Sequence, residues 1–209
     1  LINKSNVIII PFDHRNEISS CKNIIDNIYS NSDTDIFVCG GHKTYFKSKI
    51  NNPSILEYNN NNNNNYNIRW EHIKTFYKDM NLDLSIYYNY FNIDSTRKSI
   101  ALYEKIKHLN IVFCHTQSST KTISLPENIK AYINDNKYII ICANENIYNK
   151  NQSYFEIANK FINIPIAEYI DVIKNAYEIF VIDSCFSCIV HPLSVSNKLN
   201  TQKIEICSR

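Results

Sequence analysis

The amino-acid sequence predicts an α/β fold with parallel sheets and flanking helices. Short apolar runs of the kind found in buried strands alternate with segments whose apolar residues recur at helical spacing. Strands separated by helices of this length pair in parallel through crossover connections. The 209 residues suffice for one large domain or two small ones, and 44% of them are hydrophobic, so a packed core is expected.

Residues 1–109 are predicted to form a first α/β unit. Its expected strands are continuous apolar runs, at Val7–Phe12, Asp35–Cys39 and Ser54–Tyr58. Helical spacing of apolar residues predicts helices, at 15–30, 69–80 and 95–108, the last with Ser95 as its N-cap. The uninterrupted asparagine run at 59–65 predicts a disordered surface loop.

Residues 110–209 are predicted to form a second, Rossmann-like unit. Five apolar runs are its expected strands, at Ile111–His115, Lys137–Ala143, Ile164–Ile166, Glu178–Ile182 and Lys203–Cys207. Helical or mixed segments lie between them, at 123–134, 153–162, 167–176 and 184–196. In such a sheet the ligand belongs at the carboxyl ends of the strands.

Charge and cysteine usage argue against several classes of protein. Lys and Arg exceed Asp and Glu by only two, which is too balanced for a protein held to nucleic acid by a basic face. The seven cysteines are odd in number and mostly lie in apolar runs, which favours reduced, buried thiols and an intracellular location, the cytoplasm. No signal peptide or transmembrane segment is expected, and the missing initiator Met indicates part of a longer chain.

The sharpest local signal is the sequence EIFVIDSCFS, in which an apolar strand runs into Asp183 and Ser184 before a helix. Ser184 is the expected N-cap, and Ser187 falls in the first turn. The N–H groups and the dipole at such a helix start favour an anion. Only two glycines occur in the chain, so a glycine-rich phosphate loop is not expected. A capped helix that holds no ligand would show the same pattern.

Three segments together resemble a known family. They are YIDVIKNAYEIFVIDSCFSCIV at 169–190, RWEHIKTFYKDMNL at 69–82 and IVFCHTQSST at 111–120. In this order and spacing they resemble GT-B glycosyltransferases, especially the heptosyltransferase-like type of bacterial polysaccharide clusters and giant viruses. The resemblance implies a GT-B-like arrangement of two units, with residues 1–109 on the acceptor side and residues 110–209 binding the donor. For a viral protein the location would be the host cytoplasm.

The resemblance also implies an activity and a set of site residues. Members transfer a sugar from a nucleotide-sugar donor to a glycan or other hydroxyl acceptor, with no cofactor and no bound metal. The acid after the first strand is the expected catalytic base, here Asp13, with His14 as its rival. The expected donor-binding residues are His115, Ser118, Ser119, Lys121, Glu178, Asp183, Ser184 and Ser187. Asp13 would equally suit a loop cap, and its loop lacks the glycines that the family usually has there.

Other functions remain open at this point. One is a non-catalytic domain that binds a nucleotide or a sugar. Another is a thiol redox protein built on Cys185 and Cys188, although few residues follow this CxxC pair. A zinc site formed by these two cysteines with His191 and Cys207 has suitable ligand types, but a second spaced pair is missing.

Overall fold

The computed structural model describes residues 19–20, 23, 77 and 82–208. The chain divides into two compact units, residues 1–84 and 85–209, and the fold below is that of the second. This unit begins upstream of the expected boundary at 109/110, because the helix over residues 97–103 packs on it. The expected strands of the first unit and the asparagine run lie outside the described residues.

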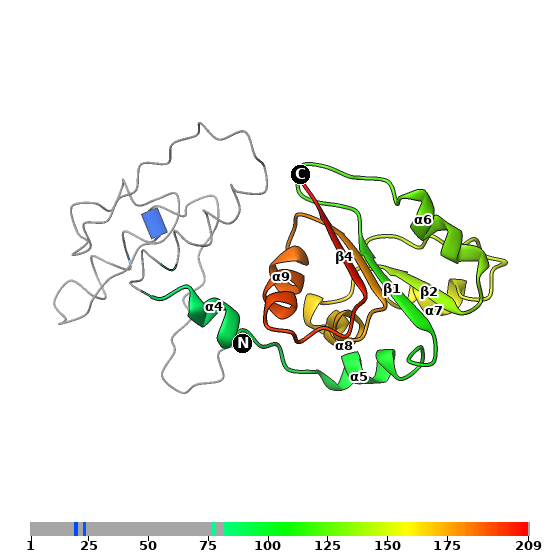
Figure 1. Cartoon of the computed structure of the whole chain (residues 1–209). Coiled ribbons are helices and arrows are strands. Elements are labelled where there is room, and N and C mark those ends of the chain that lie inside the picture. The colour runs from blue at the N-terminus through cyan, green and yellow to red at the C-terminus, as the bar shows by residue number, and fades with distance from the viewer. Residues whose placement is uncertain (1–18, 21–22, 24–76, 78–81, 209) are drawn as a thin grey trace. The chain divides into compact units, whose positions relative to one another are not determined.

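The C-terminal unit is built on a parallel sheet of four strands in the order β2-β1-β3-β4 (Figure 1). The strands are β1 Asn110–His115, β2 Tyr138–Cys142, β3 Glu178–Ile182 and β4 Lys203–Cys207. The sheet therefore starts at β1, grows outward to β2, and then crosses back over β1 to add β3 and β4. The strand order reverses between β1 and β3.

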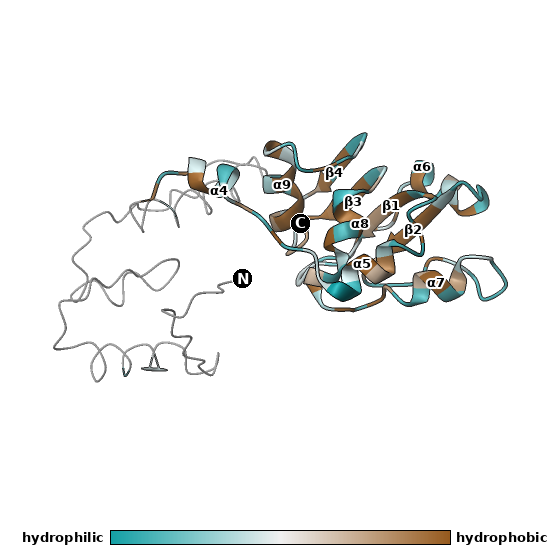
Figure 2. Ribbon diagram, turned by 90° about the horizontal axis from the view of Figure 1, so that it is seen from below, coloured by the Kyte–Doolittle hydropathy of each residue, from teal (hydrophilic) through white to brown (hydrophobic). Residues whose placement is uncertain are grey.

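Short helices precede the first strand and connect the later ones. In chain order they are α4 Ser85–Asn89, α5 Arg97–Tyr103, α6 Glu127–Lys130, the 3-10 helix η3 Ala131–Asn134, α7 Phe155–Asn159, the 3-10 helix η4 Ile166–Tyr169, α8 Ile170–Lys174 and α9 Ser187–Val195. Figure 2 shows the apolar colour concentrated on the strands, and polar colour on the outer surfaces of helices such as α5 and α8. The structure thus confirms the prediction of an α/β unit with a parallel sheet.

The strand register assigns each side chain to one of two faces. Phe113 lies opposite Ile179 in the pairing of β1 with β3, and Ile179 lies opposite Ile204 in the pairing of β3 with β4. Side chains alternate along a strand, so Val112 and Glu178 belong to the other face. All five residues of β3 are buried, which fits a strand covered on both faces in the middle of a parallel sheet.

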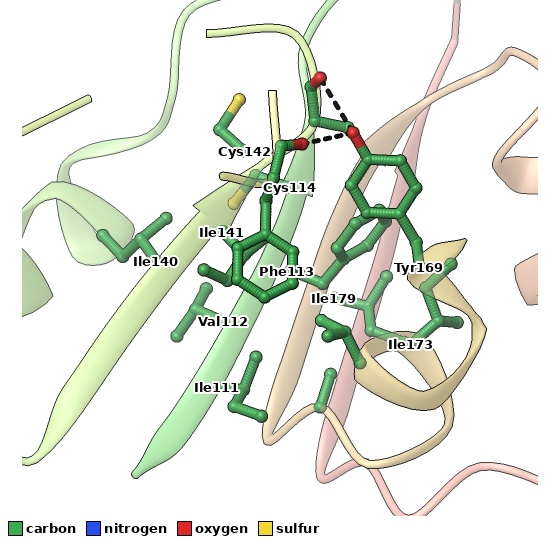
Figure 3. Packing of buried hydrophobic residues seen from close by; sticks show 14 of the residues in the cluster. Ile111, Val112, Phe113, Cys114, Ile140, Ile141, Cys142, Tyr169, Ile173 and Ile179 are labelled. Atoms are coloured by element: carbon green, nitrogen blue, oxygen red, sulfur yellow. Dashed lines mark hydrogen bonds between the residues drawn. The ribbon is translucent and has the colours of Figure 1, made fainter. Parts of the chain in front are cut away.

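An aromatic cluster fills the face covered by α8 and by the turn before α9. The Phe113 ring lies 5.7 Å from the Tyr169 ring and 5.3 Å from the Phe186 ring, and the last two rings are 5.2 Å apart. Figure 3 shows Phe113 and Tyr169 above the sheet, with the Tyr169 hydroxyl bonded to two carbonyl oxygens. These are the carbonyls of Phe161 and Ala143, so one phenol ties two loops at the end of β2.

The opposite face has a charged group at its amino edge. Glu178, the first residue of β3, is 3% exposed, and its carboxylate accepts hydrogen bonds from Lys203 Nζ at 2.7 Å and Tyr132 Oη at 3.2 Å. A buried carboxylate needs such partners, because unpaired burial costs several kcal/mol. The Lys203 contact therefore stabilises the pairing of the edge strand β4 with β3, and the Tyr132 contact holds η3 against β3.

Capping of α5 differs from the sequence prediction. The N-cap is Thr96 rather than Ser95, and Thr96 forms a reciprocal capping box with Ser99. Ser95 and Ser99 instead donate their hydroxyl protons to the Asp171 carboxylate on α8. The prediction failed because a tertiary acceptor engages the Ser95 hydroxyl, which sequence spacing cannot reveal.

Four of the five predicted strands of this unit are confirmed, and the one at Ile164–Ile166 is wrong. Asn163 has a positive φ of 52°, Pro165 lacks an N–H, and η4 begins at Ile166. The Ile164 N–H donates to the Tyr169 hydroxyl at 3.3 Å and so does not enter the sheet. The short apolar run is therefore a loop that leads into η4, and the hydroxyl of the buried Tyr169 holds it through the Ile164 N–H.

The buried phenol of Tyr169 predicts alkaline sensitivity. Burial raises the pKa of Tyr169 to about 12, above the ordinary value of about 10. The folded state then resists ionisation, so its stabilising contribution is present below pH 10 and is lost as the pH rises toward 12. We expect the Tyr169→Phe variant to lose about 1–3 kcal/mol of unfolding free energy at pH 8, because the Phe161 carbonyl loses its hydroxyl donor and the Ile164 N–H loses its acceptor. Its unfolding free energy should fall less steeply than the wild type's between pH 10 and 11.

Urea denaturation at these pH values measures both effects. The matched control is Tyr90→Phe, since Tyr90 is 77% exposed. A Tyr169→Phe variant with the wild-type slope above pH 10 would contradict this explanation.

Candidate functional site

The candidate site lies at the carboxyl ends of β1 and β3, where the strand order reverses. His115, the last residue of β1, pairs with Val181, one residue before the end of β3. The chain runs from β1 to its neighbour β2, and from β3 to its neighbour β4 on the other side of the sheet. These two connections therefore lead away from each other, and neither crosses over the adjacent ends of β1 and β3. Ligands in open α/β sheets bind at such points.

A direct hydrogen bond joins the two strand ends. His115 Nδ1 and Ser184 Oγ lie 2.9 Å apart, from positions 69 residues apart in sequence. The His115 ring also packs on Phe186, with ring centroids 4.7 Å apart. Both His115 and Ser184 are half-buried and lie at the rim of the aromatic cluster.

The turn before α9 organises the β3 side of the site. The Ser184 N–H donates to Ser187 Oγ at 2.9 Å, and the Ser187 hydroxyl lies 2.7 Å from the Ser184 carbonyl and 3.2 Å from Asp183 Oδ1. Ser187 is 2% exposed, so its hydroxyl stabilises the turn from within the fold. The structure brings Asp183, Ser184 and Ser187 together with His115.

The predicted start of the last helix needs correction. Helix α9 begins at Ser187, and its N-cap is Phe186 rather than Ser184. Phe186 is 5% exposed because its ring packs against Phe113 and Tyr169. Burial of this ring shapes the turn that precedes the helix, and it leaves the Ser184 side chain to contact His115.

A second polar group lies on the β2 side. Thr116 is fully buried, its N–H donates to Asn144 Oδ1 at 3.0 Å, and Asn144 Nδ2 donates to Thr116 Oγ1 at 2.9 Å. The Thr116 hydroxyl then has its own proton for Glu145 Oε1, at 3.1 Å. Residues that follow β1 and β2 thus form one hydrogen-bonded network beside His115.

The other predicted donor-binding residues lie at different distances from this cluster. Ser118 is engaged within a turn, where its Oγ accepts from the Lys121 N–H at 3.0 Å and the Ser118 N–H donates to the Lys121 carbonyl at 2.8 Å. Ser119 and Lys121 are exposed in the same turn, which follows β1. Glu178 is at the amino end of β3, the opposite end from Ser184, and is not part of the cluster. Asp13 and His14 lie outside the described residues.

No disulfide bond joins the five cysteines of the described residues. Cys114 and Cys142 are buried, and burial raises the pKa of both thiols, so they stay protonated at neutral pH. Cys185 and Cys188 are exposed at the turn and first helical residues of α9. Within the described part of the chain, no three His, Cys, Asp or Glu side chains gather as metal ligands, so Cys185, Cys188, His191 and Cys207 do not form the zinc site considered above.

No helix among the described residues has the length and apolar character to cross a membrane.

The electrostatics of the site depend on a neutral imidazole. Burial lowers the pKa of His115 below its ordinary value of about 6.5, so the ring is uncharged at neutral pH. In one tautomer Nδ1 accepts the Ser184 proton, and in the other it donates to Ser184 Oγ. The pair can therefore present either a donor or an acceptor to an oxygen-rich ligand.

Sequence reasoning found His115 and Ser184 but missed Thr116, Asn144 and Glu145. A usable signal was present, because each of these polar residues follows directly on an apolar strand, in FCHT and IIICANE. Polar residues in that position lie at the carboxyl edge of a parallel sheet. What the sequence does not contain is the strand order, which decides that the ends of β1, β2 and β3 are neighbours.

Comparisons with protein-family models, curated proteins and solved structures find no match to this chain.

The lowered pKa of His115 gives a testable titration. We expect one of the six histidine imidazoles to titrate below pH 6.5 in heteronuclear NMR spectra, and to disappear in the His115→Gln variant. Because the folded pKa is depressed, the contribution of His115 to stability is present above about pH 6.5 and is lost as the pH falls. Denaturation midpoints at pH 7.5 and 5.0 should therefore differ less in His115→Gln than in the wild type.

The matched variant is His108→Gln, at an exposed position away from the cluster. It should leave the low-pH signal in place. A His115 midpoint at or above 6.5 would contradict the burial argument.

Proposed function

We propose that residues 85–208 are the donor-binding unit of a GT-B-type glycosyltransferase and bind the diphosphate of a nucleotide-sugar at the ends of β1 and β3. The observation that carries the proposal is the hydrogen bond between His115 Nδ1 and Ser184 Oγ, at the point where the strand order reverses. These two residues belong to the segments that resemble the family. The resemblance implies transfer of a sugar to a glycan or other hydroxyl acceptor.

The position of the two residues in the fold supports binding of a small molecule. Four parallel strands place every carboxyl end at one edge of the sheet, and polar side chains of β1, β2 and β3 gather there. At the other end of the strands, the amino end, β3 begins with Glu178, whose carboxylate already accepts hydrogen bonds from Lys203 and Tyr132. This gathering of polar side chains at the carboxyl edge supports the binding of a ligand there.

The chemistry of the β3 side suits phosphate oxygens. The N-terminal end of the nine-residue helix α9 follows Ser184 within three residues, and its dipole favours negative charge by about 0.3–1 kcal/mol at an exposed position. The Ser184 hydroxyl and the His115 ring add side-chain hydrogen bonds. Lys121, on the turn after β1, is the cationic residue of the predicted donor set.

The transfer step needs a base on the acceptor side. We assign that role to Asp13, with His14 as the alternative, in the N-terminal unit of a two-unit GT-B arrangement. Both residues lie outside the described part of the chain. The second candidate is a non-catalytic unit that binds the nucleotide-sugar and transfers no sugar. An assay of sugar transfer distinguishes the two.

Donor binding is tested at Ser184. We expect the melting temperature to rise with at least one compound in a panel of UDP-, GDP-, ADP- and CMP-sugars, since a ligand of the folded state stabilises it. Ser184→Leu should weaken that binding by about 10- to 100-fold in calorimetry, because a hydrogen bond to a charged group is lost and the leucine fills the approach.

The control is Ser153→Leu. It is the same substitution at an exposed serine just before α7, beside Tyr154, whose hydroxyl bonds Asn136 at the amino end of β2. Ser153→Leu should bind like the wild type, and circular dichroism checks that both variants fold. Undiminished binding by a folded Ser184→Leu variant would refute the assignment.

The catalytic role is tested at Asp13. Asp13→Asn should abolish sugar transfer and leave the dissociation constant of the donor nearly unchanged, because a base acts in the transition state. Transfer is measured as release of the nucleoside diphosphate in the presence of acceptor glycans. Equal transfer by the wild type and Asp13→Asn would remove Asp13 from the mechanism. Donor binding without transfer by the wild type would favour the non-catalytic candidate.

A further inference from the structure

We infer that the outer edge of β4 is an interaction surface, and that its partner is the same edge of a second copy of this chain. The two β4 strands pair antiparallel about a two-fold axis at Ile204. The inference goes beyond the proposed function and does not depend on it, because β4 contains none of the residues assigned to donor binding.

The first observation is that the edge strand β2 has its outward amides occupied. Figure 2 shows β2 and β4 at opposite sides of the sheet. The Tyr138 N–H, which points away from β1, donates to the Asp135 carbonyl at 3.0 Å. The next outward amide, that of Ile140, donates to the Tyr148 hydroxyl at 2.9 Å. These contacts use the donors that another strand would need, so this edge is closed to further pairing.

The outer edge of β4 has no such protection among the described residues. The Asp183 N–H donates to the Cys207 carbonyl at 2.7 Å, so the backbone of Cys207 faces β3. Backbone groups alternate in direction along a strand, so those of Ile204 and Ile206 face away from β3. In the part of the chain that the structure describes, these outward N–H and C=O groups bond to no other residue. An edge of this kind is a template for another strand.

The side chains of β4 favour the same strand of a second copy. Lys203 and Glu205 lie on one face, with side chains 50% and 46% exposed, and Ile204 lies on the other. Antiparallel pairing that places Ile204 opposite Ile204 sets each Lys203 opposite Glu205 of the second copy. Two opposite-charge pairs then form on one face, and the two isoleucines meet on the other. The sequence KIE is thus complementary to itself, as a two-fold interface requires.

Charge also selects this register over its neighbours. Pairing centred on Glu205 would set two carboxylates opposite each other, and like charges in that position destabilise a sheet. Pairing centred on Ile206 would set Glu205 opposite Cys207, which carries no positive charge.

The charges of β4 permit pairing although charged side chains on an edge ordinarily discourage it. Their signs alternate along the exposed face, so antiparallel pairing satisfies both. Lys203 has three N–H donors, and it can therefore bind Glu205 of the second copy while it keeps its bond to Glu178. Five residues make a small interface, so we expect a weak dimer.

Sedimentation velocity of the full 209-residue chain tests for the dimer. We expect the weight-average mass to rise from that of one chain toward that of two as the protein concentration is raised from ~1 μM to ~1 mM, a range that covers weak dissociation constants. A reductant excludes disulfide links between copies through the exposed Cys185 and Cys188. A mass that stays at that of one chain over this range overturns the inference.

Amide hydrogen exchange followed by NMR locates the interface. We expect exchange of the Ile204 amide to slow in proportion to the fraction of paired chains, because its N–H then donates to the second copy. The Ile140 amide is the internal control, since its acceptor Tyr148 belongs to the same chain and its rate should not depend on concentration. An Ile204 amide whose exchange is equally slow or equally fast at every concentration would place the contact elsewhere and overturn the inference.

Glu205→Lys tests the charge pairing. It sets lysines opposite lysines, so we expect the dissociation constant of the dimer to rise by at least about 10-fold. The matched control is Glu127→Lys, which makes the same change of charge at an 88% exposed side chain on α6 and should dimerise like the wild type. Equal dimerisation by these two variants would refute the proposed pairing.

Ile204→Pro tests the main-chain hydrogen bonds. Proline removes an N–H that faces away from β3, which an edge strand tolerates, so we expect a folded variant by circular dichroism that stays a monomer. If this variant does not fold, the amide exchange and Glu205→Lys results decide the inference by themselves. A folded Ile204→Pro variant that dimerises like the wild type would contradict strand pairing at this edge.

Discussion

The pairing of β1 with β3 is the constraint on which the rest of this unit depends. These strands are not consecutive, and the connection between them passes through β2, α7 and α8 before it returns. Their register sets His115 opposite Val181, and β3 is buried along its whole length. A shift by one residue would move every side chain of β3 to the other face of the sheet, so that Ile179 and Glu178 would exchange faces. The shift would also remove the Glu178 carboxylate from Lys203 and Tyr132, so these contacts favour the observed register. This register brings the Ser184 hydroxyl within hydrogen-bonding distance of the His115 ring.

Polar chemistry is distributed unequally between the two ends of this sheet. At the amino end, Glu178 is neutralised by Lys203 and bonded by Tyr132, so its charge is used within the fold. At the carboxyl end, the exposed Glu145 accepts a hydrogen bond from the buried Thr116 hydroxyl, and the half-buried Ser184 is bonded to His115. The difference has a physical origin: parallel strands leave connections on both sides of β1 only where the strand order reverses.

The sequence predicted the four strands of the described unit, with a fifth at Ile164–Ile166 that is wrong, and it did not predict the contacts between the elements. The runs Glu178–Ile182 and Lys203–Cys207 match β3 and β4 because both patterns are visible locally: a continuous apolar run in the buried strand β3, and alternating apolar and polar residues in the edge strand β4. Ser184 is not the N-cap of α9, because the burial of Phe186 against Phe113 and Tyr169 determines where that helix begins. The hydrogen bond from Ser95 to Asp171 spans 76 residues, and the bond from Thr116 to Glu145 spans 29. Contacts of this range depend on strand order, which periodicity does not encode.

Phe186 links the stability of the fold to the chemistry of the site. Its ring contacts the aromatic core through Phe113 and Tyr169, and it contacts the candidate site through His115. The same apolar surroundings that stabilise the core desolvate the imidazole, and desolvation disfavours its charged form. A neutral His115 can exchange donor and acceptor roles with Ser184, whereas a charged ring would only donate. The hydrogen-bonding properties of the site are thus a consequence of core packing. A substitution that loosens the aromatic cluster would change both the free energy of unfolding and the protonation state of His115, so these two properties of the unit cannot vary independently.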